Sequence, residues 1–263
     1  MKNFKRGWGL ALLCFIWVIA LFFATAVLFS FGLIPKQYSG IVQDAIVLFG
    51  VWIFNHYLAH VPVLFWNHHN GWGQLEQAVP ALLVVGLLVS ANLTRLFTVP
   101  FTPLILMYLG YIILVGLTEE YVFRGVMIPL LARSLPGKNL AVVLTSSFLF
   151  GGLHLMNSTH LSLTYVLPQI LFAMALGTLF AGVYIRTRNL GLPILMHAAT
   201  DLSVVVQLTQ HPNSNANLDF SRNVSIVVSV FYGALLLLAI LVAARQVQNV
   251  KIPTERLKRD TQS

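Results

Sequence analysis

Eight long apolar segments run through this chain of 263 residues, and they constrain its fold more than any other feature. A helix needs about 20 mostly apolar residues to cross the hydrocarbon core of a bilayer, which is about twice what a barrel strand needs. The segments lie near 8–34, 41–66, 78–99, 101–131, 140–157, 162–185, 189–209 and 224–244. We therefore expect an all-α, polytopic transmembrane helical bundle with about eight spans.

The composition supports this expectation and argues against other classes of protein. Charged residues make up 9% of the chain, whereas an ordinary soluble domain carries about 25%. A soluble enzyme, a disordered linker and a nucleic-acid partner are therefore not expected, although the formal net charge is +8. Because Cys14 is the only cysteine, neither an intramolecular disulfide nor a Cys-rich zinc module can form.

The basic residues predict the orientation, because cytoplasmic loops of membrane proteins are enriched in Lys and Arg. If the N-terminus lies inside, 12 of the 16 basic residues fall on the inner side and 3 (Lys36, Arg95 and Arg222) on the outer side. We expect a multi-pass protein of the cell membrane with both termini cytoplasmic. Residues 1–244 would form one transmembrane domain, and residues 245–263 a basic cytoplasmic tail. The N-terminal run could pass for a signal peptide, but it continues to Ile34, which favours an uncleaved first span.

The fourth span contains a cluster of charge in the sequence GLTEEYVFRG, residues 116–125. Each charged residue at a helix centre costs about 2.5–3.5 kcal/mol on insertion scales, so these side chains must face one another or a hydrated cavity. Glu120 and Arg124 are i,i+4 neighbours and can form an ion pair. Glu119 points elsewhere and has no local basic partner. It needs one from another helix, or it carries a proton.

Two other spans supply such partners. The fifth span places Phe150 and His154 on one helix face, and the seventh places His197 and Asp201 on one face. At 1.5 Å per residue, Glu119 and His154 lie about 21 and 24 Å from the inner surface. His197 and Asp201 lie about 14 and 20 Å from it. Each pair alone also fits a structural role, but the matched depth favours a shared site.

A carboxylate and two imidazoles in a hydrated cavity suit the activation of water. Glu119 can take a proton from water, one histidine can orient that water, and the other can stabilise an oxyanion. Alternatively, Glu119, His154 and His197, with or without Asp201, hold a divalent metal such as zinc that activates the water. The residues alone leave both mechanisms open.

The three motifs, EEYVFRG, F-x-x-x-H and H-x-x-x-D, occur in order on separate spans between residues 101 and 205. They resemble those of the CPBP intramembrane metalloprotease family, also called the CAAX prenyl protease type II or ABI family. The resemblance implies an endopeptidase that cleaves a membrane protein or a lipidated peptide. Glu119 would activate water, His154 would assist, and His197 with the residue four positions later would form the oxyanion or metal site. Glu120 and Arg124 would orient Glu119.

One departure affects the third motif, which often ends in Asn but here ends in Asp201. An amide can donate a hydrogen bond to an oxyanion, whereas an ionised carboxylate repels it. Asp201 must therefore be protonated, bind a metal or orient His197.

Two other functions remain open at the level of sequence. The family also includes members linked to bacteriocin immunity, so a non-proteolytic immunity or membrane scaffold protein is one alternative. A proton-coupled transporter is another, because carboxylates inside a membrane can relay protons. The chain shows no inverted repeat, which weighs against a transporter.

Overall fold

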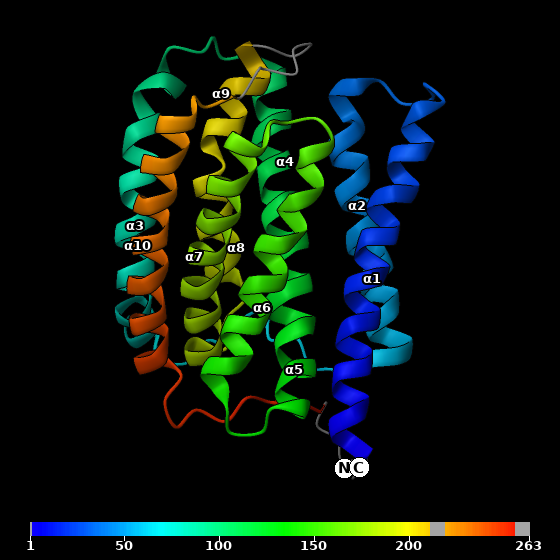
Figure 1. The fold of residues 1–263 in the computed structure, drawn as a ribbon, viewed down its shortest axis with the longest axis vertical. Coiled ribbons are helices and arrows are strands. Elements are labelled where there is room, and N and C mark those ends of the chain that lie inside the picture. Colours follow the sequence, from blue (N-terminus) through cyan, green and yellow to red (C-terminus); the bar gives the residue numbers. More distant parts are fainter. Residues whose placement is uncertain (1, 211–218, 256–263) are drawn as a thin grey trace.

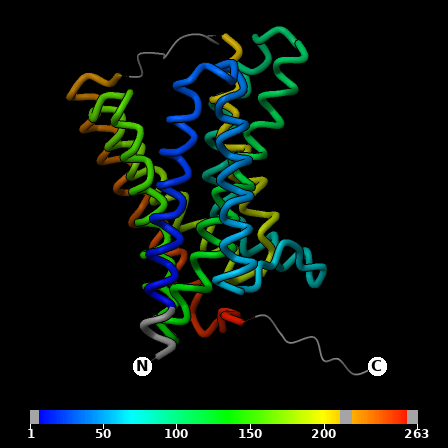
Figure 2. Tube along the Cα trace, turned by 90° about the vertical axis from the view of Figure 1, so that its right-hand side faces the viewer, coloured from blue at the N-terminus to red at the C-terminus, as the bar shows by residue number. Residues whose placement is uncertain are grey.

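The computed structural model describes the backbone over residues 2–210 and 219–255, with side chains from Gly7 onward. In this part of the chain, eight helical spans are long and apolar enough to cross a membrane, as predicted. Most of them run along the long axis of the molecule (Figures 1 and 2). The start of the first helix and the segment after the last helix lie at the same end of the bundle in both views.

The spans comprise ten α-helices and three short segments of other helical types. They are α1 (Lys2–Ser30), α2 (Lys36–Phe54), the π-helix η1 (Asn55–Ala59), α3 (Gly71–Phe97), α4 (Pro103–Glu120), the π-helix η2 (Tyr121–Met127), α5 (Ile128–Ser134), α6 (Asn139–Leu153), the 3-10 helix η3 (His154–Thr159), α7 (Leu163–Thr187), α8 (Gly191–Thr200), α9 (Leu202–Gln210) and α10 (Arg222–Gln246).

The second span is shorter than the apolar pattern predicts. It ends at Ala59 rather than near residue 66, and His60 then takes a left-handed conformation with φ of 51°. The apolar residues that follow are non-helical, and the carbonyl groups of Leu64 and Phe65 accept hydrogen bonds from the backbone at the start of α8. Hydropathy reports burial and not backbone conformation, which explains the error.

The third span begins earlier than predicted, at Gly71 instead of residue 78. The side chain of Asn70 accepts a hydrogen bond from the backbone N–H of Gly73, which caps the helix start. Because the first turns of α3 are polar, hydropathy alone placed this boundary too late.

Each of the three sequence motifs coincides with an irregularity in its helix. The π-helix η2 follows directly after Glu120, η3 begins at His154, and Asp201 separates α8 from α9. Single π-helical turns leave backbone groups in need of partners and are frequent at functional sites. Here the hydroxyl of Ser146 donates to the carbonyl of Phe123 within η2, at 2.9 Å.

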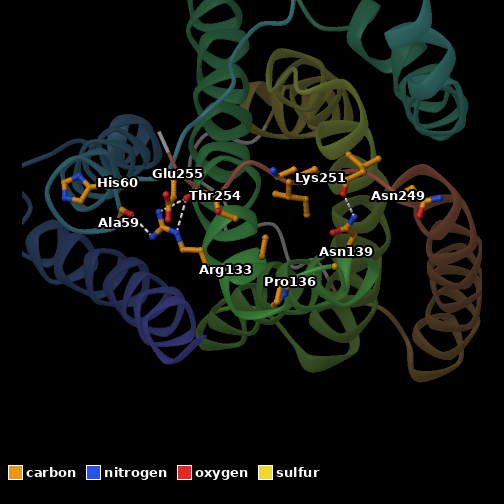
Figure 3. Close-up of a pocket in the computed structure, with 13 residues that line it drawn as sticks. Ala59, His60, Arg133, Pro136, Asn139, Asn249, Lys251, Thr254 and Glu255 are labelled. Carbon is orange, nitrogen blue, oxygen red and sulfur yellow. Dashed lines mark hydrogen bonds between the residues drawn. The ribbon is translucent and has the colours of Figure 1, made fainter. Parts of the chain in front are cut away.

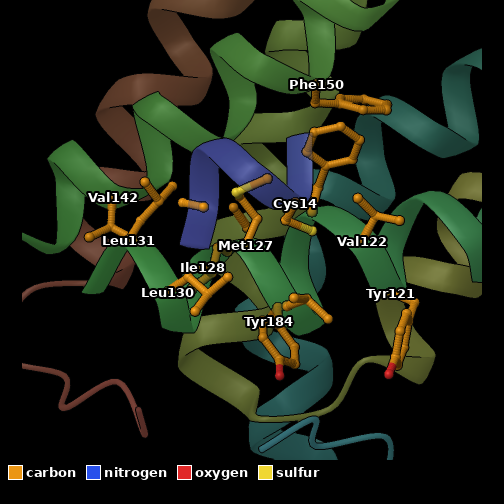
Figure 4. Packing of buried hydrophobic residues seen from close by; sticks show 14 of the residues in the cluster. Cys14, Tyr121, Val122, Met127, Ile128, Leu130, Leu131, Val142, Phe150 and Tyr184 are labelled. Carbon is orange, nitrogen blue, oxygen red and sulfur yellow. The ribbon is translucent and has the colours of Figure 1, made fainter. Parts of the chain in front are cut away.

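The hydrophobic core lies where η2 and α5 pack against α1, α2 and α6 (Figure 4). Cys14, Met127, Ile128 and Leu131 are completely buried there. Many large apolar side chains on the outside of the bundle are exposed, as expected for helices that face lipid.

Candidate active site

The fourth and seventh spans approach each other closely at Gly116, one turn before the paired glutamates. A β-carbon at this position would lie 2.9 Å from the carbonyl oxygen of Ile194 and 3.4 Å from the β-carbon of His197. Small residues let membrane helices pack this closely. Gly116, which precedes the first motif, therefore allows α4 to bring its carboxylates against the histidine of the third motif.

His197 lies between the two glutamates. Its Nδ1 is 2.7 Å from Oε1 of Glu120, and its Nε2 is 3.2 Å from Oε2 of Glu119. Glu120 is completely buried, whereas 18% of the Glu119 side chain is exposed. Glu119 thus finds its partner on another helix, as predicted, and it is the carboxylate of the pair that solvent can reach.

Arg124 balances the charge of Glu120, as the i,i+4 spacing predicts. Its Nη1 lies 3.1 Å from Oε1 of Glu120, and its guanidinium stacks 4.6 Å above the ring of Phe150. Arg124 is 1% exposed, and no group in the described residues is aligned to accept a hydrogen bond from it. The contact with Glu120 is therefore an ion pair, and the aromatic face gives the cation further stabilisation.

His154 lies on the same helix face as Phe150, as predicted, with the two rings 5.2 Å apart. Its Nδ1 is 3.1 Å from the carbonyl oxygen of Phe150. A carbonyl oxygen can only accept, so we assign the proton to Nδ1. This assignment leaves Nε2 of the neutral ring as a hydrogen-bond acceptor.

Glu119 and His154 line one open cavity of about 280 Å³. A water molecule occupies about 30 Å³ in the liquid, so the cavity has room for several. Its walls come from α1, α2, α4 and α6 with the turns that follow it. The other lining residues are Phe22, Ala26, Gln43, Leu153, Met156, Asn157, Thr159 and His160.

Asp201 lies beside the contact between Glu119 and His197. Its Oδ2 is 3.7 Å from Nε2 of His197, which is within ion-pair range and too long for a hydrogen bond. The side chain is 25% exposed. This placement is compatible with the orienting role that the sequence left open for Asp201.

Sequence reasoning missed one carboxylate near the site. Asp44 of α2 is 6% exposed, and its carbonyl oxygen accepts a hydrogen bond from Oγ1 of Thr118 at 3.3 Å. It lies close enough to Glu119, Asp201 and His197 to interact electrostatically. An acidic residue within an apolar span could have marked Asp44 as a candidate site residue. The sequence does not show, however, which neighbouring helices its side chain faces.

The predicted metal ligands are not arranged to bind a metal ion together. Both ring nitrogens of His197 already face carboxylates, Nδ1 toward Glu120 and Nε2 toward Glu119. Over residues 2–210 and 219–255, no group of three or more His, Cys, Asp or Glu side chains is arranged to hold a metal ion. The divalent metal therefore stays an untested prediction, and the mechanism proposed below does not use it.

A larger cavity of about 770 Å³ lies where the second and fourth spans end (Figure 3). It contains His60, Arg133 and Lys251 and none of the residues predicted for the site. Arg133 donates there to the carbonyl oxygens of Ala59 and Thr254. These bonds join the end of the second span, the end of the fourth and the segment after α10.

Residues 100–203 match the family model for Rce1-like proteins, described as type II CAAX prenyl endopeptidase Rce1-like. The matched region extends from the residues before α4 into α9 and therefore contains all three motifs. The resemblance predicted from the motifs is confirmed over this part of the chain. No curated protein and no solved structure matches the chain.

Proposed function

We propose, from the match of residues 100–203 to type II CAAX endopeptidases, that this chain is an intramembrane endopeptidase of the cell membrane. It would hydrolyse a peptide bond in a membrane protein or a lipidated peptide, with Glu119 activating water. The observation that carries the proposal is the position of Glu119. It is a partly exposed carboxylate on a cavity large enough for water, and a histidine from another helix holds it in place.

The first step of the reaction is attack of water on the substrate carbonyl. Glu119 takes a proton from the water as the oxygen bonds to the carbonyl carbon. His197 holds Glu119 through Nε2, while Glu120 holds the other side of the imidazole at 2.7 Å. The ion pair of Glu120 with Arg124 fixes that support within the helix.

The second step is collapse of the tetrahedral intermediate. Glu119 returns the proton to the amide nitrogen, the C–N bond breaks, and the amine leaves. In the first step, His154 would orient the attacking water through its Nε2, which the contact of Nδ1 with the carbonyl of Phe150 leaves available. When protonated, His197 carries positive charge toward the oxyanion, which favours its formation.

The test is substitution of the two residues that line the cavity. Glu119→Gln keeps the size of the side chain but removes the base, and His154→Ala removes the imidazole. General acid–base catalysis contributes about 10²–10⁴-fold, so each variant should lose at least roughly 10²-fold in turnover. Cleavage would be measured on a library of membrane-anchored reporter peptides reconstituted in liposomes with the purified protein.

Glu76→Gln is the matched control, since Glu76 is an exposed residue on α3 far from the motifs in sequence. It should cleave at the rate of the unaltered protein. Full turnover by Glu119→Gln would contradict the mechanism. If Glu119→Gln instead keeps a bacteriocin-immunity phenotype in cells while no reporter is cleaved by any form, the scaffold function takes its place.

A further inference from the structure

In the described part of the chain, the cavity that Glu119 and His154 line opens toward one end of the bundle. The cavity that holds Glu119 and His154 continues to Thr159 and His160, which are both exposed. These two residues stand at the end of the fifth span, just before α7 begins. The route from solvent to Glu119 therefore leads from that end.

The other direction is filled by protein. The residues that follow Glu120 along the fourth span, from Tyr121 to Ala132, are all buried. They form the core shown in Figure 4 together with α1 and α6. Beneath this core, Arg133 fastens the ends of the second and fourth spans to the segment after α10. A chain arriving from this end would have to displace the core.

The basic residues identify the closed end. Six described Lys and Arg residues lie in the last helical turns or connections there: Arg133, Lys138, Arg186, Arg188, Arg245 and Lys251. Only Lys36, Arg95 and Arg222 lie at the opposite, open end in the described part of the chain. By the positive-inside rule, the closed end is cytoplasmic and the open end faces outward.

We propose that the site takes its substrate from the exoplasmic side, as a polypeptide segment that emerges from the membrane on that face. That the bound segment is a substrate depends on the proposed function. The direction of access is inferred independently, from the position of the cavity, the buried core and the distribution of basic residues. Toward the cytoplasmic leaflet, the groove between the second and fourth spans is lined by Leu117 and Tyr121 but not by Glu119 or His154, so a substrate presented there would not meet the catalytic pair.

The lining of the cavity suits an extended peptide. The amide nitrogens of Gln43 and Asn157 donate to Thr25 and Gln169, at 2.9 and 3.0 Å. Their side-chain carbonyl oxygens are therefore the groups available to accept hydrogen bonds from backbone N–H groups of a substrate. Phe22, Ala26 and Met156 provide apolar contacts for side chains.

Labelling of introduced cysteines tests the direction of access without any assay of cleavage. Thr159→Cys marks the mouth of the cavity and Lys251→Cys marks the closed end, while the native Cys14 is completely buried. Sealed spheroplasts that express each variant are treated with a membrane-impermeant maleimide, before and after permeabilisation. We expect at least tenfold more labelling of Thr159→Cys than of Lys251→Cys in sealed spheroplasts, and equal labelling after permeabilisation.

The reverse pattern, or equal labelling of both variants in sealed spheroplasts, would overturn the inference. His160→Cys serves as a second probe of the mouth if Thr159→Cys does not accumulate. In liposomes with the reporter library, a bulky maleimide on Thr159→Cys should reduce cleavage at least tenfold relative to the same variant without label. The adduct on Lys251→Cys should not reduce it, and equal cleavage by both adducts would also overturn the inference. If the unaltered protein cleaves no reporter, the proposed function fails while the labelling result still decides the direction of access.

Discussion

Single side chains set the charge balance of the site. Four carboxylates, those of Asp44, Glu119, Glu120 and Asp201, lie around Arg124 and His197. Burying more negative than positive charge is costly, so the cluster is stable only if a carboxylate gains a proton or meets water. Three of these carboxylates contact His197, and of the three Glu119 and Asp201 are partly exposed while Glu120 is completely buried. Glu119 also lines the cavity.

We expect Asp201→Asn to be tolerated without loss of turnover. The change removes one negative charge from the cluster, and the amide can donate a hydrogen bond to an oxyanion that a carboxylate would repel. Turnover on the reporter library should be equal to that of the unaltered protein or severalfold higher, with no loss of resistance to unfolding by SDS. Asp201→Leu is the comparison, since it removes the charge without supplying a donor. If Asn and Leu reduce turnover equally, Asp201 itself is needed to orient His197.

Removal of metal should leave the activity unchanged. His197 uses both ring nitrogens on carboxylates, and no three-donor group is arranged for a metal in the described residues. Protein dialysed against a strong chelator should therefore cleave the reporters at its original rate, with less than one metal ion per chain by elemental analysis. Loss of turnover that returns on adding zinc would establish the metal mechanism that the sequence left open.

At the scale of helices, close contact between α4 and α8 positions the catalytic groups. Gly116→Ala places a methyl group 2.9 Å from the carbonyl oxygen of Ile194, and backbone cannot move aside cheaply. Overpacking of this kind costs about 1–3 kcal/mol. We expect the free energy of unfolding in SDS to fall by that amount, and turnover to fall with it as Glu119 moves away from His197.

The control for this prediction lies on the same helix. A β-carbon at Gly110 would have no atom within 4 Å, so Gly110→Ala should change the free energy of unfolding by less than about 0.5 kcal/mol. Equal behaviour of the two variants would show that the close approach at Gly116 does not hold the site together.

Sequence patterns predict the elements well and their irregular turns poorly. The eight spans, the ion pair of Glu120 with Arg124 and the need of Glu119 for a distant partner all follow from apolar length and helical spacing. The π-helix after Glu120 and the 3-10 turn at His154 do not, because the apolar spacing of a helix does not record a local change in its backbone hydrogen bonding. The bond of His197 to Glu120 was missed for the same reason, since spacing within one helix cannot describe a contact between two.

At the scale of the whole molecule, the two ends of the bundle differ in structure. The open end carries the cavity, while the segment after α10 crosses the basic end and is fastened to other helices. The side chain of Asn139, at the start of α6, donates to the carbonyl oxygens of Val247 and Val250 at 2.9 and 2.6 Å. The guanidinium of Arg133 holds Thr254 further along. This segment keeps the ends of four spans together beneath the core.

We expect Asn139→Ala to release this segment. The variant loses two hydrogen bonds, each of which contributes about 1 kcal/mol, so local opening of the segment should become easier by about 2 kcal/mol. Lys251 lies within it and is exposed, which makes tryptic cleavage after this residue the measurement, read by mass spectrometry. Asn92→Ala is the control, because over residues 2–210 and 219–255 the amide of Asn92 bonds within its own helix, to Leu88. Because the cavity lies beyond the core, reporter cleavage by Asn139→Ala should persist even as cleavage after Lys251 accelerates. Loss of reporter cleavage together with faster tryptic cleavage after Lys251 would mean that the basic end and the site unfold as one unit.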